Sequence, residues 1–288
     1  MLCQKIRIWN RGIFMNKPKL LFYNSDQLLE GPCWDKKNNV LYFVSILNCR
    51  IYAIDPYSGE LNIIKTEGPV GCAVVEENGS ILEAELSGIY RINPITGEKK
   101  YITNFLETEN VRYNDGKLGP NGRFYVGSMF YNQYTKGSGK LFCLDGREKK
   151  ILIENTTISN GLGFSNDEKY MYFIDTPTKR IGRYFYDKET GNILFDKYVV
   201  EIQGEGMPDG MCVARDDTIW VAEWGAGKVS HWNPATGKKI EEIMFPCLNV
   251  SSCCFGGEKD EFLFVTTGKH DDGTESEELA GGLFFVKI

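Results

Sequence analysis

The 288-residue chain has 42% hydrophobic and 25% charged residues, the composition of an ordinary globular protein with enough apolar side chains for a large core. Its formal net charge is −6 and its basic residues form no block, which argues against nucleic acid or an anionic membrane as a principal partner. No apolar run reaches the roughly 18 residues that a membrane-spanning helix needs.

Nine cysteines are scattered along the chain without a CxxC pair. An odd number at irregular spacing does not fit the disulfide framework of a small secreted domain. The basic N-terminal stretch, MLCQKIRIWNRGIF, lacks the continuous apolar segment of a secretory signal. We therefore predict a cytoplasmic protein whose residues 1–18 form an N-terminal tail, and we infer no protein partner.

From residue 19 onward the chain consists of short strand-like runs separated by turns. No long run has the 3.6-residue periodicity of an amphipathic helix. In chain order, strands are predicted at residues 19–24, 40–46, 51–55, 89–93, 123–129, 140–145, 171–175, 181–186, 218–224, 229–233, 262–268 and 282–288. This pattern predicts an all-β protein.

Turn-forming residue pairs divide these runs into units of similar length. The pairs lie at residues 38–39, 78–79, 121–122, 166–167, 216–217 and 259–260. Four-stranded units of roughly 40 to 50 residues, repeated six times, are typical of a six-bladed β-propeller. We therefore predict a single six-bladed β-propeller over residues 19–288, closed by pairing of the last strand with residues 19–24. The alternative, a two-sheet sandwich, does not require six evenly phased turns.

One position recurs just before the first apolar run of each unit. It falls at residues 30, 72, 114, 160, 209 and 252. Because the first strand of each blade lines the central channel, these positions form a ring around its mouth. At three of them an oxygen donor is followed directly by glycine: Glu30, Asn160 and Asp209.

Two carboxylates and one carboxamide that converge on an axis suit a hard cation. A buried, unpaired carboxylate is costly, and a cation would neutralise Asp209 and Glu30. We predict that Glu30, Asn160 and Asp209 bind one divalent cation, which is Ca²⁺, Zn²⁺, Mg²⁺ or Mn²⁺ because all four accept such ligands. Taken singly, each of these residues followed by glycine is equally an ordinary β-turn, but the phase with the repeat favours a ligand set.

A further ring position carries Arg112 and Asn114. Two residues apart on an extended segment, their side chains project to the same face, where both can bind a polyhydroxyl or carboxylate substrate. The same alternation predicts Asp115 on the other face, where it holds the turn or supports the site from behind.

The segments that carry these residues resemble a known family. They read LEGPCWDKKNNVLYFVSI, RYNDGKLGPNGRFYVGSM, SNGLGFSNDEKYMYFIDT, PDGMCVARDDTIWVAEWG and SSCCFGG. In this order they are similar to the regucalcin family, also called senescence marker protein 30, which includes gluconolactonases and luciferin-regenerating enzymes. The resemblance runs from about Lys19 to the C-terminus.

This resemblance implies a propeller lactonase with one divalent cation in its central channel. The metal ligands of the family fall on Glu30, Asn160 and Asp209, and its substrate contacts fall on Arg112 and Asn114. The general base proposed for the family falls on Asp209.

One residue departs from the pattern of the family. Asn132 stands where regucalcin has an acidic residue that touches the sugar, and it follows Phe130 and Tyr131. Asn132 is thus a predicted substrate-binding residue in a less acidic and more aromatic rim, which opens the question of whether the substrate is an aldonolactone.

The leading hypothesis is metal-assisted hydrolysis of a small-molecule lactone such as gluconolactone, with Asp209 as the general base. The alternatives are a calcium-binding regulatory propeller without turnover, an organophosphate hydrolase and an enzyme of the luciferin-regenerating type. The chain has only two histidines, so a three-histidine zinc site is excluded. We predict that His231 is packed within a strand and that His270 lies in a loop.

Overall fold

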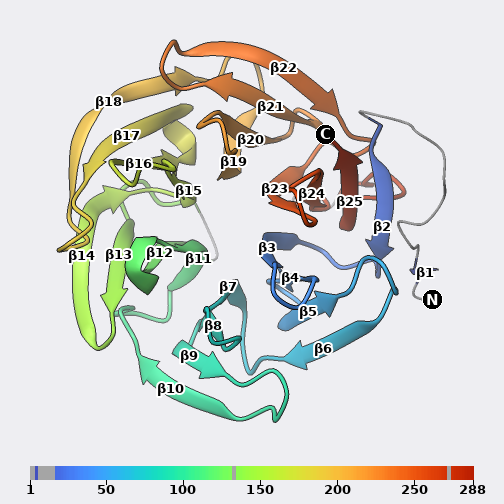
Figure 1. Ribbon diagram of the computed structural model, residues 1–288, viewed down its shortest axis with the longest axis horizontal. Coiled ribbons are helices and arrows are strands. Elements are labelled where there is room, and N and C mark those ends of the chain that lie inside the picture. The colour runs from blue at the N-terminus through green and yellow to red at the C-terminus, as the bar shows by residue number, and fades with distance from the viewer. Residues whose placement is uncertain (1–3, 6–16, 132–133, 271–273) are drawn as a thin grey trace.

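Six antiparallel sheets surround a central axis in the computed structural model, which describes residues 4–5, 17–131, 134–270 and 274–288 (Figure 1). The described residues form strands and two short 3₁₀ segments, η1 (Pro120–Gly122) and η2 (Thr176–Thr178), with no α-helix. The predicted six-bladed all-β propeller is therefore confirmed. No helix among these residues has the length and apolarity to cross a bilayer.

Each sheet runs from an inner strand at the axis to an outer strand at the rim. The first two consist of β3 (Leu29–Asp35), β4 (Val40–Ser45), β5 (Arg50–Ile54) and β6 (Leu61–Lys65), then β7 (Val70–Val75), β8 (Ile81–Glu85), β9 (Gly88–Ile92) and β10 (Lys99–Thr103). The third and fourth consist of β11 (Val111–Leu118), β12 (Phe124–Phe130), β13 (Gly139–Asp145) and β14 (Glu148–Thr156), then β15 (Ser159–Phe164), β16 (Tyr170–Asp175), β17 (Arg180–Tyr186) and β18 (Ile193–Glu201). The fifth consists of β19 (Met207–Val213), β20 (Ile219–Trp224), β21 (Lys228–Asn233) and β22 (Lys238–Met244).

The sixth sheet joins the two ends of the chain. It contains β23 (Val250–Gly256), β24 (Phe262–Thr267) and β25 (Gly282–Lys287), followed by β2 (Lys19–Tyr23) and β1 (Gln4–Lys5). The pairing of β25 with β2 confirms the predicted closure of the ring. The predicted division into a tail over residues 1–18 and a propeller over residues 19–288 stays a prediction, since most of the tail lies outside the described residues.

Burial falls from the axis to the rim because inner strands are covered on both faces by neighbouring blades. β24 is buried at all six positions, whereas β22 is exposed at six of seven. At the closure, the Phe22 ring of β2 lies 5.5 Å from that of Phe43 and 4.9 Å from that of Tyr52. These aromatic contacts fasten the N-terminal strand to the first blade. The eight described cysteines are free thiols.

All six inner strands share an irregularity near the axis. Each pairs with the second strand of its blade through a register shift, which falls at residues 30–33, 70–72, 113–116, 159–162, 208–211 and 250–252. A bulge bends the strand and redirects a side chain. The repeated bulge therefore turns one side chain per blade away from the sheet packing at the ring positions predicted from the sequence.

Glycines at these bulges allow adjacent inner strands to approach closely. A Cβ atom on Gly161 would lie 2.6 Å from the Asp209 carbonyl oxygen, and one on Gly210 would lie 2.0 Å from the Ser252 Oγ atom. Gly31 has a φ angle of +50°, a left-handed conformation that glycine adopts without a steric penalty. The glycines that follow the predicted ligands are thus required by inter-blade packing and by backbone conformation.

Candidate functional site

The three predicted metal ligands lie on the inner strands of three blades. Glu30 is on β3, Asn160 on β15 and Asp209 on β19, each within or at the edge of its bulge. Their side chains are buried, with exposed fractions of 7%, 5% and 6%. Ionisable and amide side chains at such depth need compensation from hydrogen bonds or opposite charge.

The two carboxylates lack sufficient compensation. Burial raises the pKa of Glu30 to about 8, aided by the charge of Asp115 and opposed by the Gly31 amide and Arg112. Burial also raises the pKa of Asp209 well above its ordinary value, and the charges of Glu30 and Asp115 raise it further, opposed by a hydrogen bond with Asn160 and by the charge of Arg112. Three carboxyl groups, those of Glu30, Asp209 and Asp115, therefore lie close enough at the axis to disfavour one another's ionisation.

The unused acceptors of the site can be identified atom by atom. Glu30 Oε2 accepts a hydrogen bond from the Gly31 amide at 2.8 Å, whereas Asp209 Oδ1 is buried without a hydrogen-bond partner among the described residues. Asn160 Nδ2 donates to Thr176 Oγ1 at 2.9 Å, which fixes the opposite orientation for its carbonyl oxygen. An orphaned carboxylate oxygen beside a second carboxylate and an oriented amide oxygen fits a divalent cation.

Among the described residues, no three His, Cys, Asp or Glu side chains are arranged as a metal site. The candidate set is consistent with this finding because it includes only two such residues, and its third donor is an amide. Its all-oxygen chemistry is that of hard cations rather than of thiolate or imidazole sites.

The structure places Arg112 and Asn114 directly beside this set. Arg112 donates to Asn114 Oδ1 at 2.7 Å and to the Tyr113 carbonyl at 2.9 Å. Asn114 Nδ2 in turn donates to Asn160 Oδ1 at 3.1 Å and to the Ser159 carbonyl at 3.0 Å. A hydrogen-bonded chain thus links the guanidinium to the amide of the candidate ligand. Both side chains are buried at the axis.

Asp115 shows where strict strand alternation fails. Its Oδ1 atom accepts a hydrogen bond from the Gly116 amide at 2.8 Å, as expected for a residue that holds the turn. However, its charge raises the pKa of both Glu30 and Asp209, so the side chain is part of the electrostatics of the site. The bulge between Tyr113 and Gly116 breaks the alternation that would have placed it elsewhere.

Asn132 and the two histidines are the remaining residues singled out in the sequence. Asn132 lies outside the described residues, and its neighbours Phe130 and Tyr131 are half-buried. His231 stacks on Trp220, with ring centroids 4.0 Å apart, and its Nε2 atom lies 2.7 Å from Thr218 Oγ1, which agrees with the predicted packing role. His270 follows β24 in the loop before β25, where its Nε2 atom lies 3.6 Å from a carboxylate oxygen of Glu277.

Comparisons with known proteins identify the family of the chain. The profile described as "SMP-30/Gluconolactonase/LRE-like region" matches residues 28–269. The chain belongs to this family. Regucalcin of Xenopus laevis is a family relative 30% identical over 270 residues, which cover 89% of each chain. The Bacillus subtilis protein named "Putative sugar lactone lactonase YvrE" is 32% identical over 266 residues, 90% of each chain.

Solved structures share the fold of this family member. A luciferin-regenerating enzyme superimposes with a TM-score of 0.82 at 25% identity, over 91% of this chain and 93% of that one. The calcium-binding protein regucalcin of Agrobacterium tumefaciens superimposes with a TM-score of 0.85 at 24% identity, over 91% and 90% of the two chains. The fold shared with these two structures therefore covers almost the whole propeller.

Proposed function

We propose that the protein hydrolyses a lactone with the help of one divalent cation held by Glu30, Asn160 and Asp209. Membership of the gluconolactonase-like family supports the reaction class. The observation that carries the proposal is the orphaned Asp209 oxygen beside a second uncompensated carboxylate. When bound, the cation would act as a Lewis acid on the ester carbonyl.

Asp209 is the proposed general base. In the cation-free protein, burial and the neighbouring carboxyl groups raise the pKa of Asp209. A bound cation opposes this shift because it stabilises the carboxylate, so Asp209 would act as the base through the oxygen that does not bind the cation. A base whose pKa lies closer to the operating pH transfers a proton more effectively, which typically contributes about 10²–10⁴-fold to the rate. Asp209 would take one proton from the water that attacks the lactone carbonyl.

Arg112 and Asn114 are the proposed substrate-binding residues. Their mutual hydrogen bond and the contact with Asn160 hold the guanidinium in one orientation before substrate arrives. A preorganised donor costs little entropy when it meets a hydroxyl or carbonyl oxygen of the lactone. We include Asn132 as a third substrate contact, from its position in the family pattern.

A lactone panel tests this function. Gluconolactone and less polar lactones are assayed with Ca²⁺, Zn²⁺, Mg²⁺ or Mn²⁺ added to EDTA-treated protein, alongside the phosphotriester paraoxon. We expect cation-dependent lactone hydrolysis that Asp209→Asn reduces by at least about 10²-fold. The matched control is Asp35→Asn, which replaces a buried carboxylate that holds a turn at the other end of β3.

The outcomes separate the candidate functions. Cation binding without turnover on any lactone would support a calcium-binding regulatory propeller, which the all-oxygen donor set also permits. Faster hydrolysis of paraoxon than of every lactone would support the phosphotriesterase alternative. Full activity in Asp209→Asn would contradict the assignment of the base.

A further inference from the structure

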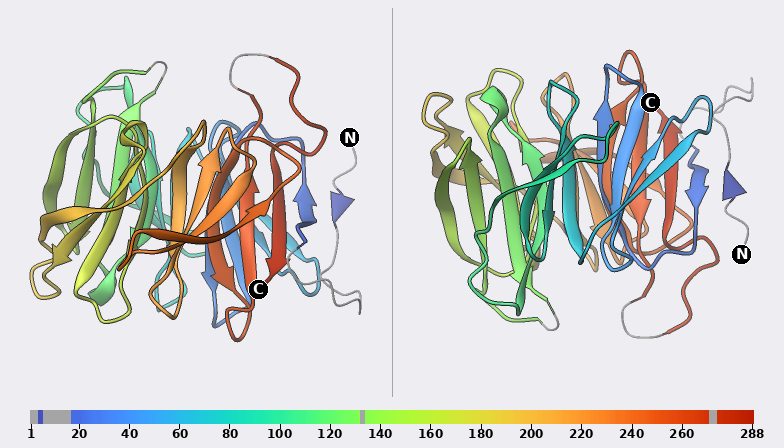
Figure 2. Two further views of the ribbon diagram at one scale, coloured as in Figure 1. Left: turned by 90° about the horizontal axis from the view of Figure 1, so that it is seen from above. Right: turned by 90° about the horizontal axis from the view of Figure 1, so that it is seen from below.

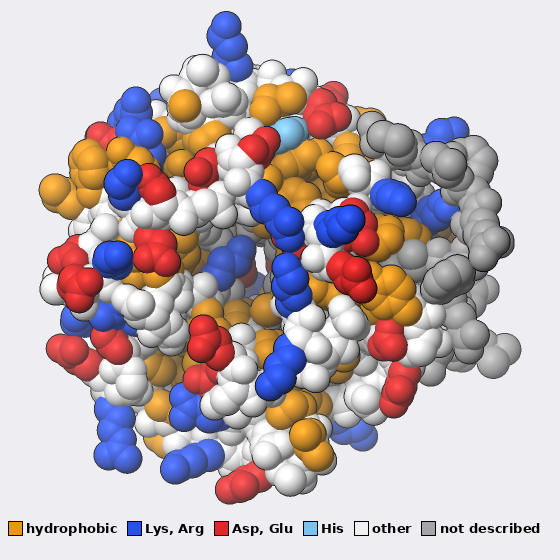
Figure 3. All heavy atoms as spheres, viewed as in Figure 1, with side chains coloured by type: hydrophobic (Ala, Val, Ile, Leu, Met, Phe, Trp, Pro, Cys, Tyr) orange, Lys and Arg blue, Asp and Glu red, His pale blue; other side chains and the backbone are white. Residues whose placement is uncertain are grey.

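A cavity of about 760 Å³ lies at the end of the channel away from Arg112. Its inner wall includes Gly31, Asp115 and Gly116, and it reaches the turn that follows β11, whereas Arg112 lies near the start of that strand. It opens on the face that carries the C-terminus, opposite the loop before β25 (Figure 2). Figure 3 shows the hollow at the centre of this face. Its volume is that of small-molecule sites, which typically measure about 300–1,000 Å³.

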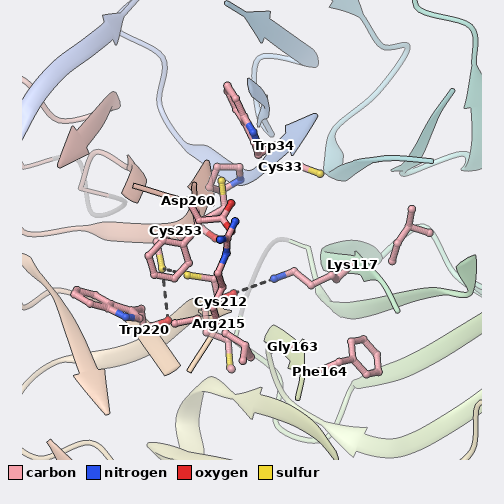
Figure 4. Close-up of a pocket in the computed structure, with 18 of the residues that line it drawn as sticks. Cys33, Trp34, Lys117, Gly163, Phe164, Cys212, Arg215, Trp220, Cys253 and Asp260 are labelled. Atoms are coloured by element: carbon pink, nitrogen blue, oxygen red, sulfur yellow. Dashed lines mark hydrogen bonds and ion pairs between the residues drawn. The ribbon is translucent and has the colours of Figure 1, made fainter. Parts of the chain in front are cut away.

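The walls of this cavity are largely aromatic and aliphatic. Trp34, Phe164 and Phe255 come from three different blades and are only partly buried, so each ring leaves apolar surface in the cavity. Figure 4 shows Trp34 and Phe164 on opposite sides of it. Apolar surface that faces a concave, solvent-accessible space favours a ligand that covers it.

One cation projects into this apolar space. Lys117, on β11, is half-buried, and its ammonium reaches across the cavity to donate to the Met211 carbonyl at 3.3 Å (Figure 4). An ammonium has three donors, and this single long hydrogen bond satisfies one of them. In the described part of the chain, Lys117 forms no other hydrogen bond and no ion pair, although its charge lowers the pKa of Asp115.

The other cations of the lining do not compete for this role, and the Asp115 carboxyl group at the inner wall accepts a hydrogen bond from the Gly116 amide. Lys36 and Lys259 are exposed at the mouth, and Arg215 is ion-paired with Asp260. Asp216 accepts hydrogen bonds from the Thr218 amide and hydroxyl. Lys117 is therefore the cation that a ligand deep in the cavity would meet.

We propose that this cavity is a second ligand site, which binds a small aromatic carboxylate. The ring system would lie against Trp34 and Phe164, and the carboxylate would accept hydrogen bonds from Lys117. A charge-assisted hydrogen bond in a poorly solvated site is stronger than a neutral one. A polyhydroxylated acid fits poorly, because the apolar walls would leave its hydroxyl groups without partners. This inference does not depend on the proposed lactonase activity.

Calorimetric titration with 2-naphthoate tests the site. The titration is made in EDTA, so that no cation at the predicted metal centre can hold the carboxylate. We expect one molecule to bind per chain. Lys117→Met should weaken binding by about 10- to 100-fold, the contribution of a hydrogen bond to a charged group, whereas Lys117→Arg should retain it.

Three controls locate the ligand. Neutral 2-naphthalenemethanol should bind wild type and Lys117→Met equally, and any binding of gluconate at the proposed lactonase site should be the same in both proteins. Lys36→Met at the mouth and Arg112→Met at the other end of the channel should leave 2-naphthoate affinity within about twofold of wild type. Absence of binding to wild type at millimolar 2-naphthoate would overturn the proposal. Equal affinity in Lys117→Met, or loss of binding in Arg112→Met, would also overturn it.

Discussion

Replacement of Glu30 by glutamine should stabilise the protein in EDTA and destabilise it relative to wild type when a cation is present. Glu30 is 7% exposed, and its pKa rises from 4.5 to about 8. A folded-state pKa above the unfolded value means that the folded state holds the proton more tightly. Protonated Glu30 therefore contributes its full stabilisation of the folded state below pH 4.5, and this contribution is lost as the pH rises towards 8.

The expected magnitude follows from this interval. Each pH unit above 4.5 costs about 1.4 kcal/mol, so at pH 7 the carboxylate costs about 3 kcal/mol of unfolding free energy. Glutamine carries no charge, and its carbonyl can still accept the Gly31 amide hydrogen bond. In EDTA, Glu30→Gln should therefore exceed wild type by up to about 3 kcal/mol at pH 7 and match it near pH 4.5.

Urea unfolding followed by tryptophan fluorescence measures this difference across the pH range. Saturating Ca²⁺ should stabilise wild type much more than Glu30→Gln, because a cation binds and stabilises only the folded ligand set. A variant with the same pH dependence as wild type in EDTA would refute the electrostatic argument. An equal gain from Ca²⁺ in both proteins would refute Glu30 as a ligand.

Three further predictions concern residues around the candidate metal site and the pairing of β2 with β25 that closes the ring. Thr176→Val removes the hydroxyl that orients the Asn160 amide and should weaken cation affinity by about 10- to 100-fold in a calorimetric titration, without unfolding the protein. Gly210→Ala forces a Cβ against β23 and should lower the unfolding free energy by about 1–3 kcal/mol in urea, a loss that an unchanged midpoint would disprove. Phe22→Ala should cost about 3–5 kcal/mol in thermal unfolding if β2 is part of the sixth blade, and almost nothing if the strand is dispensable.

Much of the fold follows from local sequence features. Each turn pair and each short apolar run can be recognised from its own segment of the sequence. Six similar units of this kind can bury their apolar faces only against one another, which predicts the propeller. The positions of Glu30, Asn160 and Asp209 follow from the same repeat, because equivalent points of equivalent blades face the same axis. The Arg112 and Asn114 pair follows from alternation over two residues, which the bulge leaves intact.

The roles of Asp115 and Lys117 depend on contacts between blades, which no local sequence pattern contains. The bulge in β11 turns Asp115 towards the two carboxylates, and its charge matters only because strands from other blades bring them near. Lys117 reads in the sequence as an ordinary surface lysine, yet it meets the Met211 carbonyl of a distant blade in an apolar cavity.

The sequence by itself therefore determined the architecture and the ring of candidate ligands, since both depend on a period that each blade repeats. Only the tertiary structure decided how strongly the carboxylates interact and what lies at the other end of the channel. Electrostatic energy and cavity shape depend on distances between blades, and those distances arise when glycine-lined inner strands pack around the axis.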